Sequence, residues 1–182
     1  MTELPAESDG WTEMSFLLVQ IQACRLMYPV IGARRHSSTN TLDDIAEKRR
    51  FVTERSQALR GKYGFQSETP GELCRIAFQH CNTALYKMNF ILQLREEVVS
   101  QKQDGLQRDE GSVQRPSFKI ACSVLESYRT YTKGSADSRF KWLFSAFTQW
   151  YALAYILRCL CISSNIPDAD YAWGLIEDTF PE

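Results

Sequence analysis

The chain has 182 residues, of which 44% are hydrophobic and 12% aromatic, and its net charge at pH 7 is −1. This length fits one domain with a sizeable core, and so balanced a charge gives no whole-protein field that would attract nucleic acid. The most basic region, residues 34–62, carries eight Lys or Arg against four Asp or Glu. Such a mixed-sign region is more typical of a solvated helix face than of a nucleic-acid interface.

The first ten residues, MTELPAESDG, are acidic and lack the basic start and apolar run of a signal peptide. We expect residues 1–10 to be disordered and residues 11–182 to form a single helical domain. We also expect the protein to be intracellular, either nuclear or cytoplasmic.

The cysteines and histidines show no metal-ligand spacing. No CxxC pair occurs among the six cysteines, and His36 and His80 are the only histidines. Zinc sites in proteins use closely spaced cysteine and histidine ligands. We therefore expect no bound metal and no cofactor.

The first predicted helix covers residues 14–28. Its apolar residues recur at helical intervals, which places them on one face. These residues are Met14, Leu17, Leu18, Ile21, Cys24 and Tyr28. Pro29 and Gly32 mark the end of the helix.

The next two helices have clear start signals. Thr41 precedes two aspartates and fits an N-cap. The second helix then carries a sparse apolar stripe, namely Leu42, Ile45, Val52 and Leu59. In the segment Thr69–Glu72, a capping Thr is followed by Pro at the first helical position and by Glu three residues after the cap. The third helix should be long and end near Gln101.

The polar segment at 100–115, SQKQDGLQRDEGSVQR, contains two glycines and predicts a mobile loop. A fourth helix follows, with one apolar face formed by Phe118, Ala121, Cys122, Leu125 and Tyr128. After Gly134 comes the stretch FKWLFSAFTQWYALAYILRCLC, from Phe140 to Cys161. A last short helix begins after Pro167.

The Phe140–Cys161 stretch is too short for a membrane span. Its charge-free run, from Trp142 to Leu157, has sixteen residues and includes polar ones, whereas a bilayer span needs about 20 mainly apolar residues. A helix that is apolar around its whole circumference is instead buried. We therefore predict an all-α fold with about six helices around a central Phe140–Cys161 helix, and no membrane association.

Four segments, in order, resemble the fungal-specific transcription factor domain, the helical regulatory region of zinc binuclear cluster regulators. "WTEMSF" with the later "RL" is similar to the family's "TEM-x-F … RL", and "LRGKYGF" to its "eekYl" segment. The stretch from Phe140 to Cys161 resembles "W-x-F-x-x-x-x-QWhA-x-A-x-x-L-x-x-LC", and "YAWGLIEDTF" resembles "AW-x-x-i-x-x-x-F". The matching segments run from Trp11 to Phe180, and the resemblance implies an all-α fold.

The sequence departs from that family in the segments on which the family's DNA binding depends. The family's run of six closely spaced cysteines, which holds two zinc ions, has no counterpart here, nor has its coiled-coil linker. The first half of the regulatory domain, which would precede Trp11, is also missing, and Tyr151 stands where relatives often have His. We therefore expect the C-terminal half of a regulatory domain, standing alone and making no direct contact with nucleic acid.

Seven residues are candidates for a ligand pocket. The polar ones interrupt apolar helical stretches, and a buried amide needs a hydrogen-bond partner. That partner belongs either to a neighbouring helix or to a ligand in an apolar pocket; for the aromatic ones and for His80, core packing is the alternative. The seven are Gln20, Arg25, His80, Phe147, Gln149, Trp150 and Tyr151. No motif assigns a catalytic residue.

Two functions from different classes remain open. The first is a stand-alone regulatory or ligand-binding module tied, by the resemblance, to a secondary-metabolite pathway. It would bind a protein partner or a hydrophobic small molecule, or would cover its exposed surface by forming a homodimer. The second is a cofactor-free cyclase or pericyclase of Diels-Alderase type, folding an apolar terpenoid or polyketide in a helical pocket. A donor such as Gln149, Tyr151 or Lys141 would then polarise a substrate carbonyl.

Overall fold

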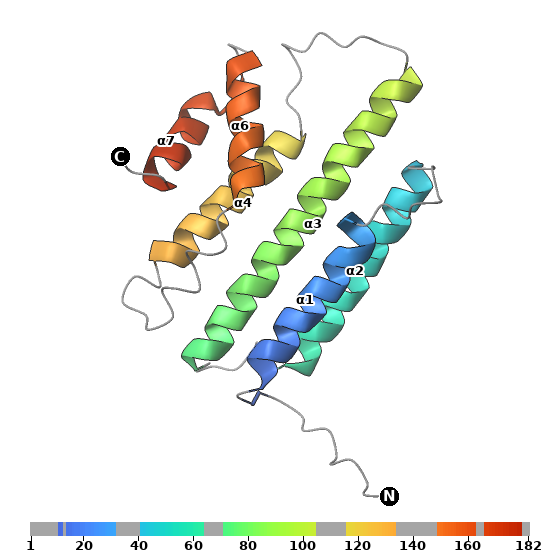
Figure 1. The fold of residues 1–182 in the computed structure, drawn as a ribbon. Helices are drawn as coiled ribbons and strands as arrows, with labels where there is room; N and C mark the ends of the chain where they lie inside the picture. The colour runs from blue at the N-terminus through green and yellow to red at the C-terminus, as the bar shows by residue number, and fades with distance from the viewer. Residues whose placement is uncertain are drawn as a thin grey trace, which may run out of the picture.

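The computed structural model describes residues 11–12, 14–31, 41–63, 71–104, 116–133, 149–162 and 166–179. These residues form helices and no strand, so the predicted all-α class with about six helices is confirmed. The helices, shown in Figure 1, are α1 (Ser15–Ile31), α2 (Leu42–Lys62), α3 (Glu72–Asp104), α4 (Pro116–Lys133), α6 (Trp150–Ile162) and α7 (Ala169–Thr179). None of these helices combines the length and apolar character that crossing a bilayer requires.

The central element is α3. It has 33 residues, which corresponds to a length of about 50 Å. Helices α1 and α2 lie along one side of it, and α4, α6 and α7 lie on the other (Figure 1). An isolated helix is only marginally stable in water, so α3 depends on burial against both groups of helices.

The first core lies between α3 and the pair α1 and α2. On α3 it uses a stripe with helical spacing, and on α2 it uses the predicted stripe apart from Leu42, which is exposed. Its buried members are Val19, Ala23, Leu26, Val30, Ile45, Val52, Leu59, Tyr63, Ala77, Cys81, Ala84, Met88 and Leu92. The Thr41 N-cap of α2 is confirmed, because the backbone N–H of Asp44 donates to Thr41 Oγ1 at 3.2 Å.

The second core lies between α3 and the three C-terminal helices. The five residues predicted for one face of the fourth helix are all buried, as expected, and all but Tyr128 belong to this core. The buried residues of the second core are Phe90, Phe118, Ala121, Cys122, Val124, Leu125, Ala152, Ile156, Cys159, Ala172 and Leu175. The partly buried side chain of Ile91 packs against both cores, so α3 joins the two cores.

The predicted central helix at Phe140–Cys161 is wrong in two respects. Gln149 is not helical: its carbonyl accepts from the backbone N–H groups of Ala152 and Leu153, which makes it the residue before the first turn of α6. Residues 134–148 lie outside the described residues. The described part, α6, packs on α4 and α7 at the side of the fold (Figure 1), and the centre is taken by α3.

The face that apolar spacing predicts for α1 is not its buried face. Its buried residues are Ser15, Val19, Ala23, Leu26 and Val30, whereas Met14, Leu17, Leu18, Ile21 and Tyr28 are exposed. We call the exposed set, together with Ile31, the outer stripe. The sequence of α1 is apolar on two opposite faces, and α3 and α2 cover only one of them.

Helix boundaries also differ from the predictions. Pro29 does not end α1, which continues to Ile31. Helix α3 starts at Glu72, and the carbonyl of Gly71 accepts from the backbone N–H of Arg75 at 3.1 Å. Thr69 and Pro70, the predicted cap and first helical residue, lie outside the described residues. The same helix continues through Asp104, beyond the expected end near Gln101. The remainder of the predicted loop, residues 105–115, and the predicted disordered segment, residues 1–10, lie outside the described residues.

Candidate functional site

A partly buried polar cluster joins α3 to α4. Ser117 is fully buried and is the second residue of α4. Its backbone N–H donates to Glu97 Oε1 at 2.9 Å, and its hydroxyl donates to Glu97 Oε2 at 2.7 Å. The first N–H groups of a helix have no partner within the helix, and a carboxylate is favourable at that end. Glu97 of α3 therefore caps α4 from a neighbouring helix.

Tyr155 of α6 is the third member of this cluster. Its hydroxyl forms a short hydrogen bond with Ser117 Oγ, and its ring packs edge-on against Phe90 with a centroid distance of 5.2 Å. Burial raises the pKa of Tyr155, so the phenol remains protonated at neutral pH. Glu97, Ser117 and Tyr155 thus connect three helices at one point.

Sequence reasoning missed this cluster. The available signal is local: α4 begins with Pro116, which has no N–H, and the residue before it, Arg115, carries no side-chain acceptor. A helix start of this kind needs an acceptor from elsewhere in the protein. Nothing in the spacing identifies Glu97 as that acceptor.

Tyr151 lies on the same side of α3, near the start of α6. Its ring is 5.6 Å from that of Phe90, measured between centroids, and Lys87 Nζ lies 4.8 Å from its ring centroid. Its hydroxyl is buried and has no hydrogen-bond partner among the described residues. Burial raises the pKa of Tyr151 well above its usual value. This group is therefore a protonated donor in a largely apolar environment.

Of the two candidates that precede Tyr151 directly in the sequence, one is buried and the other is exposed. Gln149 is 7% exposed, whereas Trp150 is 63% exposed and does not line a buried site. Phe147 and Lys141 lie outside the described residues. The expectation of a buried amide at Gln149 is therefore met, but at the start of α6 and not within a helix.

Two of the remaining candidates, Gln20 and Arg25, lie away from α6. Gln20 and Arg25 belong to α1, where Gln20 is partly buried and Arg25 is exposed. Helix α1 contacts α3 and α2 and lies across α3 from α6 (Figure 1). The predicted cleft between Gln149 and the first helix is therefore wrong, because α3 separates them.

His80 lies in α3 and is partly buried. Desolvation by burial lowers the pKa of His80, so its imidazole is neutral at neutral pH. Because the pKa is lower in the folded chain than in the unfolded chain, the unfolded chain takes up more protons as the pH falls through about 6.5. Acid therefore destabilises the fold at this position.

Two surface cavities contain none of the seven candidates. The larger, of about 380 Å³, is an open groove between α2 and α3 with an apolar floor that includes Leu42, Ile45 and Ala46. Arg49 and Glu96 form an ion pair at 2.7 Å on its rim. The smaller, of about 160 Å³, lies between α4 and the start of α7 beside Cys122. Burial is the main cause that raises the pKa of the Cys122 thiol to about 11, which makes it a poor nucleophile.

Within the described ranges, no group of three or more His, Cys, Asp or Glu side chains is placed to hold a metal ion. Comparisons with protein families, with curated proteins and with solved structures found no match for this chain.

The cluster predicts that substitutions at two neighbouring glutamates lower the stability of the fold by unequal amounts. Glu97→Gln replaces one of two acceptor oxygens by a donor that faces Ser117, so we expect the free energy of unfolding to fall by about 1–3 kcal/mol. The matched control is Glu96→Gln. Glu96 is 43% exposed and pairs with Arg49 at the surface, and such pairs contribute about 0–1 kcal/mol. Urea denaturation of both variants makes the comparison, and equal losses would contradict the capping role of Glu97.

Proposed function

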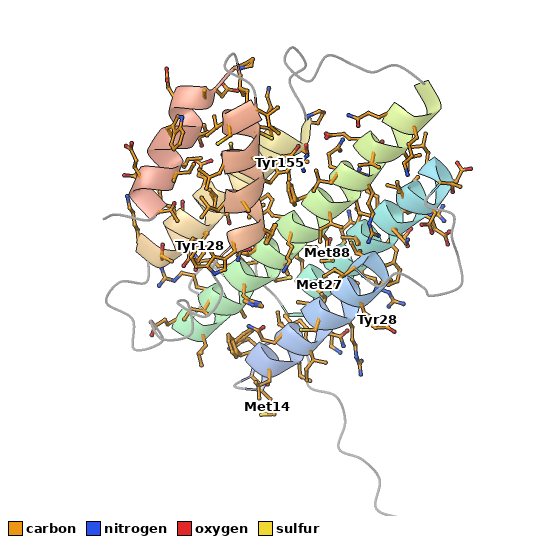
Figure 2. All side chains as sticks on the ribbon, turned by 45° about the horizontal axis from the view of Figure 1, so that its top comes forward. Met14, Met27, Tyr28, Met88, Tyr128 and Tyr155 are labelled. Carbon is orange, nitrogen blue, oxygen red and sulfur yellow. The ribbon has the colours of Figure 1, made fainter. Side chains whose placement is uncertain are left out.

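We propose that this chain is a regulatory module of the fungal transcription-factor type, which acts by binding a protein partner through α1 and does not contact DNA itself. The observation that carries the proposal is the outer stripe of α1. Its six large apolar residues are between 43% and 80% exposed. Figure 2 shows two of them, Met14 and Tyr28, on the side of α1 away from α3.

The outer stripe is as large as the largest apolar patches that folded monomers leave exposed. From the exposed fractions, its area is roughly 600 Å², at the upper end of the largest apolar patches of typical monomers. Arg25 is the only charged residue in α1. A long helix face of this composition, held in place by a packed opposite face, is typical of a protein-binding surface.

The resemblance of the four sequence segments supports the regulatory part of the proposal. The described parts of these segments lie at α1, at the end of α2, in α6 and in α7. A net charge of −1 favours action through a partner and not through direct contact with DNA.

A second candidate function rests on Tyr151. A buried polar group without a partner is costly, by about 1–3 kcal/mol, and such groups are expected where a ligand supplies the partner. The ring of Tyr151 lies beside that of Phe90, and its buried hydroxyl remains protonated. As a donor to the carbonyl of an apolar substrate it would polarise that carbonyl, as the cyclase hypothesis requires.

The first proposal predicts that the chain alters transcription when it is brought to DNA by another protein. Fused to an unrelated DNA-binding domain in a fungal reporter strain, the chain should change reporter output several-fold. Ile21→Glu places a charge in the centre of the outer stripe and should abolish the change. The control Tyr86→Glu, at an exposed apolar residue of α3, should not. An inactive tethered chain, or salt-sensitive DNA binding by the chain alone, would contradict the proposal.

The second candidate predicts that Tyr151→Phe weakens binding of an apolar ketone without loss of stability. The probe is β-ionone, a terpenoid ketone, and its binding is followed by quenching of tryptophan fluorescence. Loss of one hydrogen bond should raise Kd about three- to ten-fold, while the melting temperature should not fall. Tyr171→Phe, at an exposed residue of α7, is the control. An unchanged Kd in the Tyr151 variant would reject this candidate.

A further inference from the structure

We infer that the partner of the outer stripe is a second copy of this chain, with the two α1 helices antiparallel and related by a two-fold axis through Ile21. The inference rests on the proposed function in that it names the protein partner of the same surface. It is carried by three properties of the outer stripe: its register, its charge and its area.

The register of the outer stripe is self-complementary. In a two-fold helix pair centred on Ile21, each residue meets the one equally far on the other side of the centre. Met14 then lies opposite Tyr28, which gives a favourable contact between a thioether and an aromatic ring. Leu18 lies opposite Cys24, which is exposed. From Met14 to Tyr28 the stripe is about 21 Å long, so it gives several turns of contact.

The charge of α1 favours this pairing over a charged partner. Arg25, which is exposed, is the single charge between Ser15 and Ile31, so a strongly acidic or basic partner would find almost nothing to pair with. In the proposed register Arg25 lies opposite Leu17, whose surface its aliphatic stem can cover while the guanidinium stays in water. The two Arg25 residues are then about 12 Å apart along the axis, which exceeds the screening length of about 8 Å in physiological salt.

The area is sufficient for a specific dimer. Roughly 600 Å² on each copy amounts to about 1,200 Å² in total, which is the lower end of the range for stable, specific interfaces. Tyr and Met, which are enriched at interface cores, are the two most exposed large apolar residues of the stripe. The buried face of each α1 is fixed by its own α3, so pairing requires no rearrangement of the fold.

The test is the mass of the full chain in solution, measured by sedimentation between about 1 and 100 µM. The wild-type mass should rise from 21.0 kDa to twice that value with concentration. Ile21→Glu places two carboxylates together at the axis and should remain monomeric throughout. The control Tyr86→Glu should dimerise like the wild type. A wild-type chain that is monomeric at the highest concentration, or an Ile21→Glu variant that still dimerises, would overturn the inference.

A cross-link tests the register itself. At the axis of two closely packed helices the Cα atoms come within the distance that a disulfide requires. Ile21→Cys in a Cys24→Ser, Cys161→Ser background should therefore form a covalent dimer on mild oxidation, whereas Val98→Cys in the same background should not. Failure of Ile21→Cys to cross-link while the wild type dimerises would refute this register.

These results separate the inference from the proposed function. A monomeric wild type whose tethered reporter activity is nonetheless lost in Ile21→Glu would overturn the dimer and leave the regulatory function, with a different protein on the same surface. A dimer abolished by Ile21→Glu, with reporter activity unchanged, would leave the dimer and reject α1 as the regulatory contact.

Discussion

The rest of the structure depends on the burial of two faces of one long helix. Among the described helices, α1 and α2 pack against α3 and each other, and α4, α6 and α7 complete their core with Phe90 and neighbouring residues of α3. Each group of helices covers a surface of α3 that would otherwise be exposed. The Glu97–Ser117–Tyr155 cluster then fixes where α4 and α6 sit along α3, because its hydrogen bonds can form in only one register.

Local patterns in the sequence were sufficient to predict the buried face of a helix that has only one apolar face. The stripe on α4 was predicted residue by residue, and so was the Thr41 cap of α2, because spacing and capping are local properties. For α1 the spacing fits two opposite faces. The face with small side chains, Ser15 and Ala23, lies against the other helices, and the face with bulkier ones is left outside. Which face of α1 is buried depends on how closely α3 can approach it. The spacing of apolar residues within α1 carries no information about that distance.

The candidate site was predicted in part. Gln149 stood out in the sequence because its amide interrupts an apolar stretch, and Tyr151 stood out as one of the aromatic residues beside it. In the structure Gln149 and the hydroxyl of Tyr151 are both buried. Their expected convergence with Gln20 and Arg25 failed because the order of helices in space places α3 between them. Lys87 and Phe90, which do contact Tyr151, lie more than sixty residues earlier in the chain and carry no motif.

The functional argument follows from the same arrangement: because α3 fixes the inner face of α1, the outer stripe is a rigid apolar surface and not a loosely held helix. Hydrogen exchange of the intact chain, followed by mass spectrometry, tests this arrangement most directly. The account predicts that the slowest-exchanging amides lie in the middle of α3, between residues 81 and 94, and that the inner turns of α1 and α4 follow them. Exchange in the middle of α3 as fast as in α7 would contradict it.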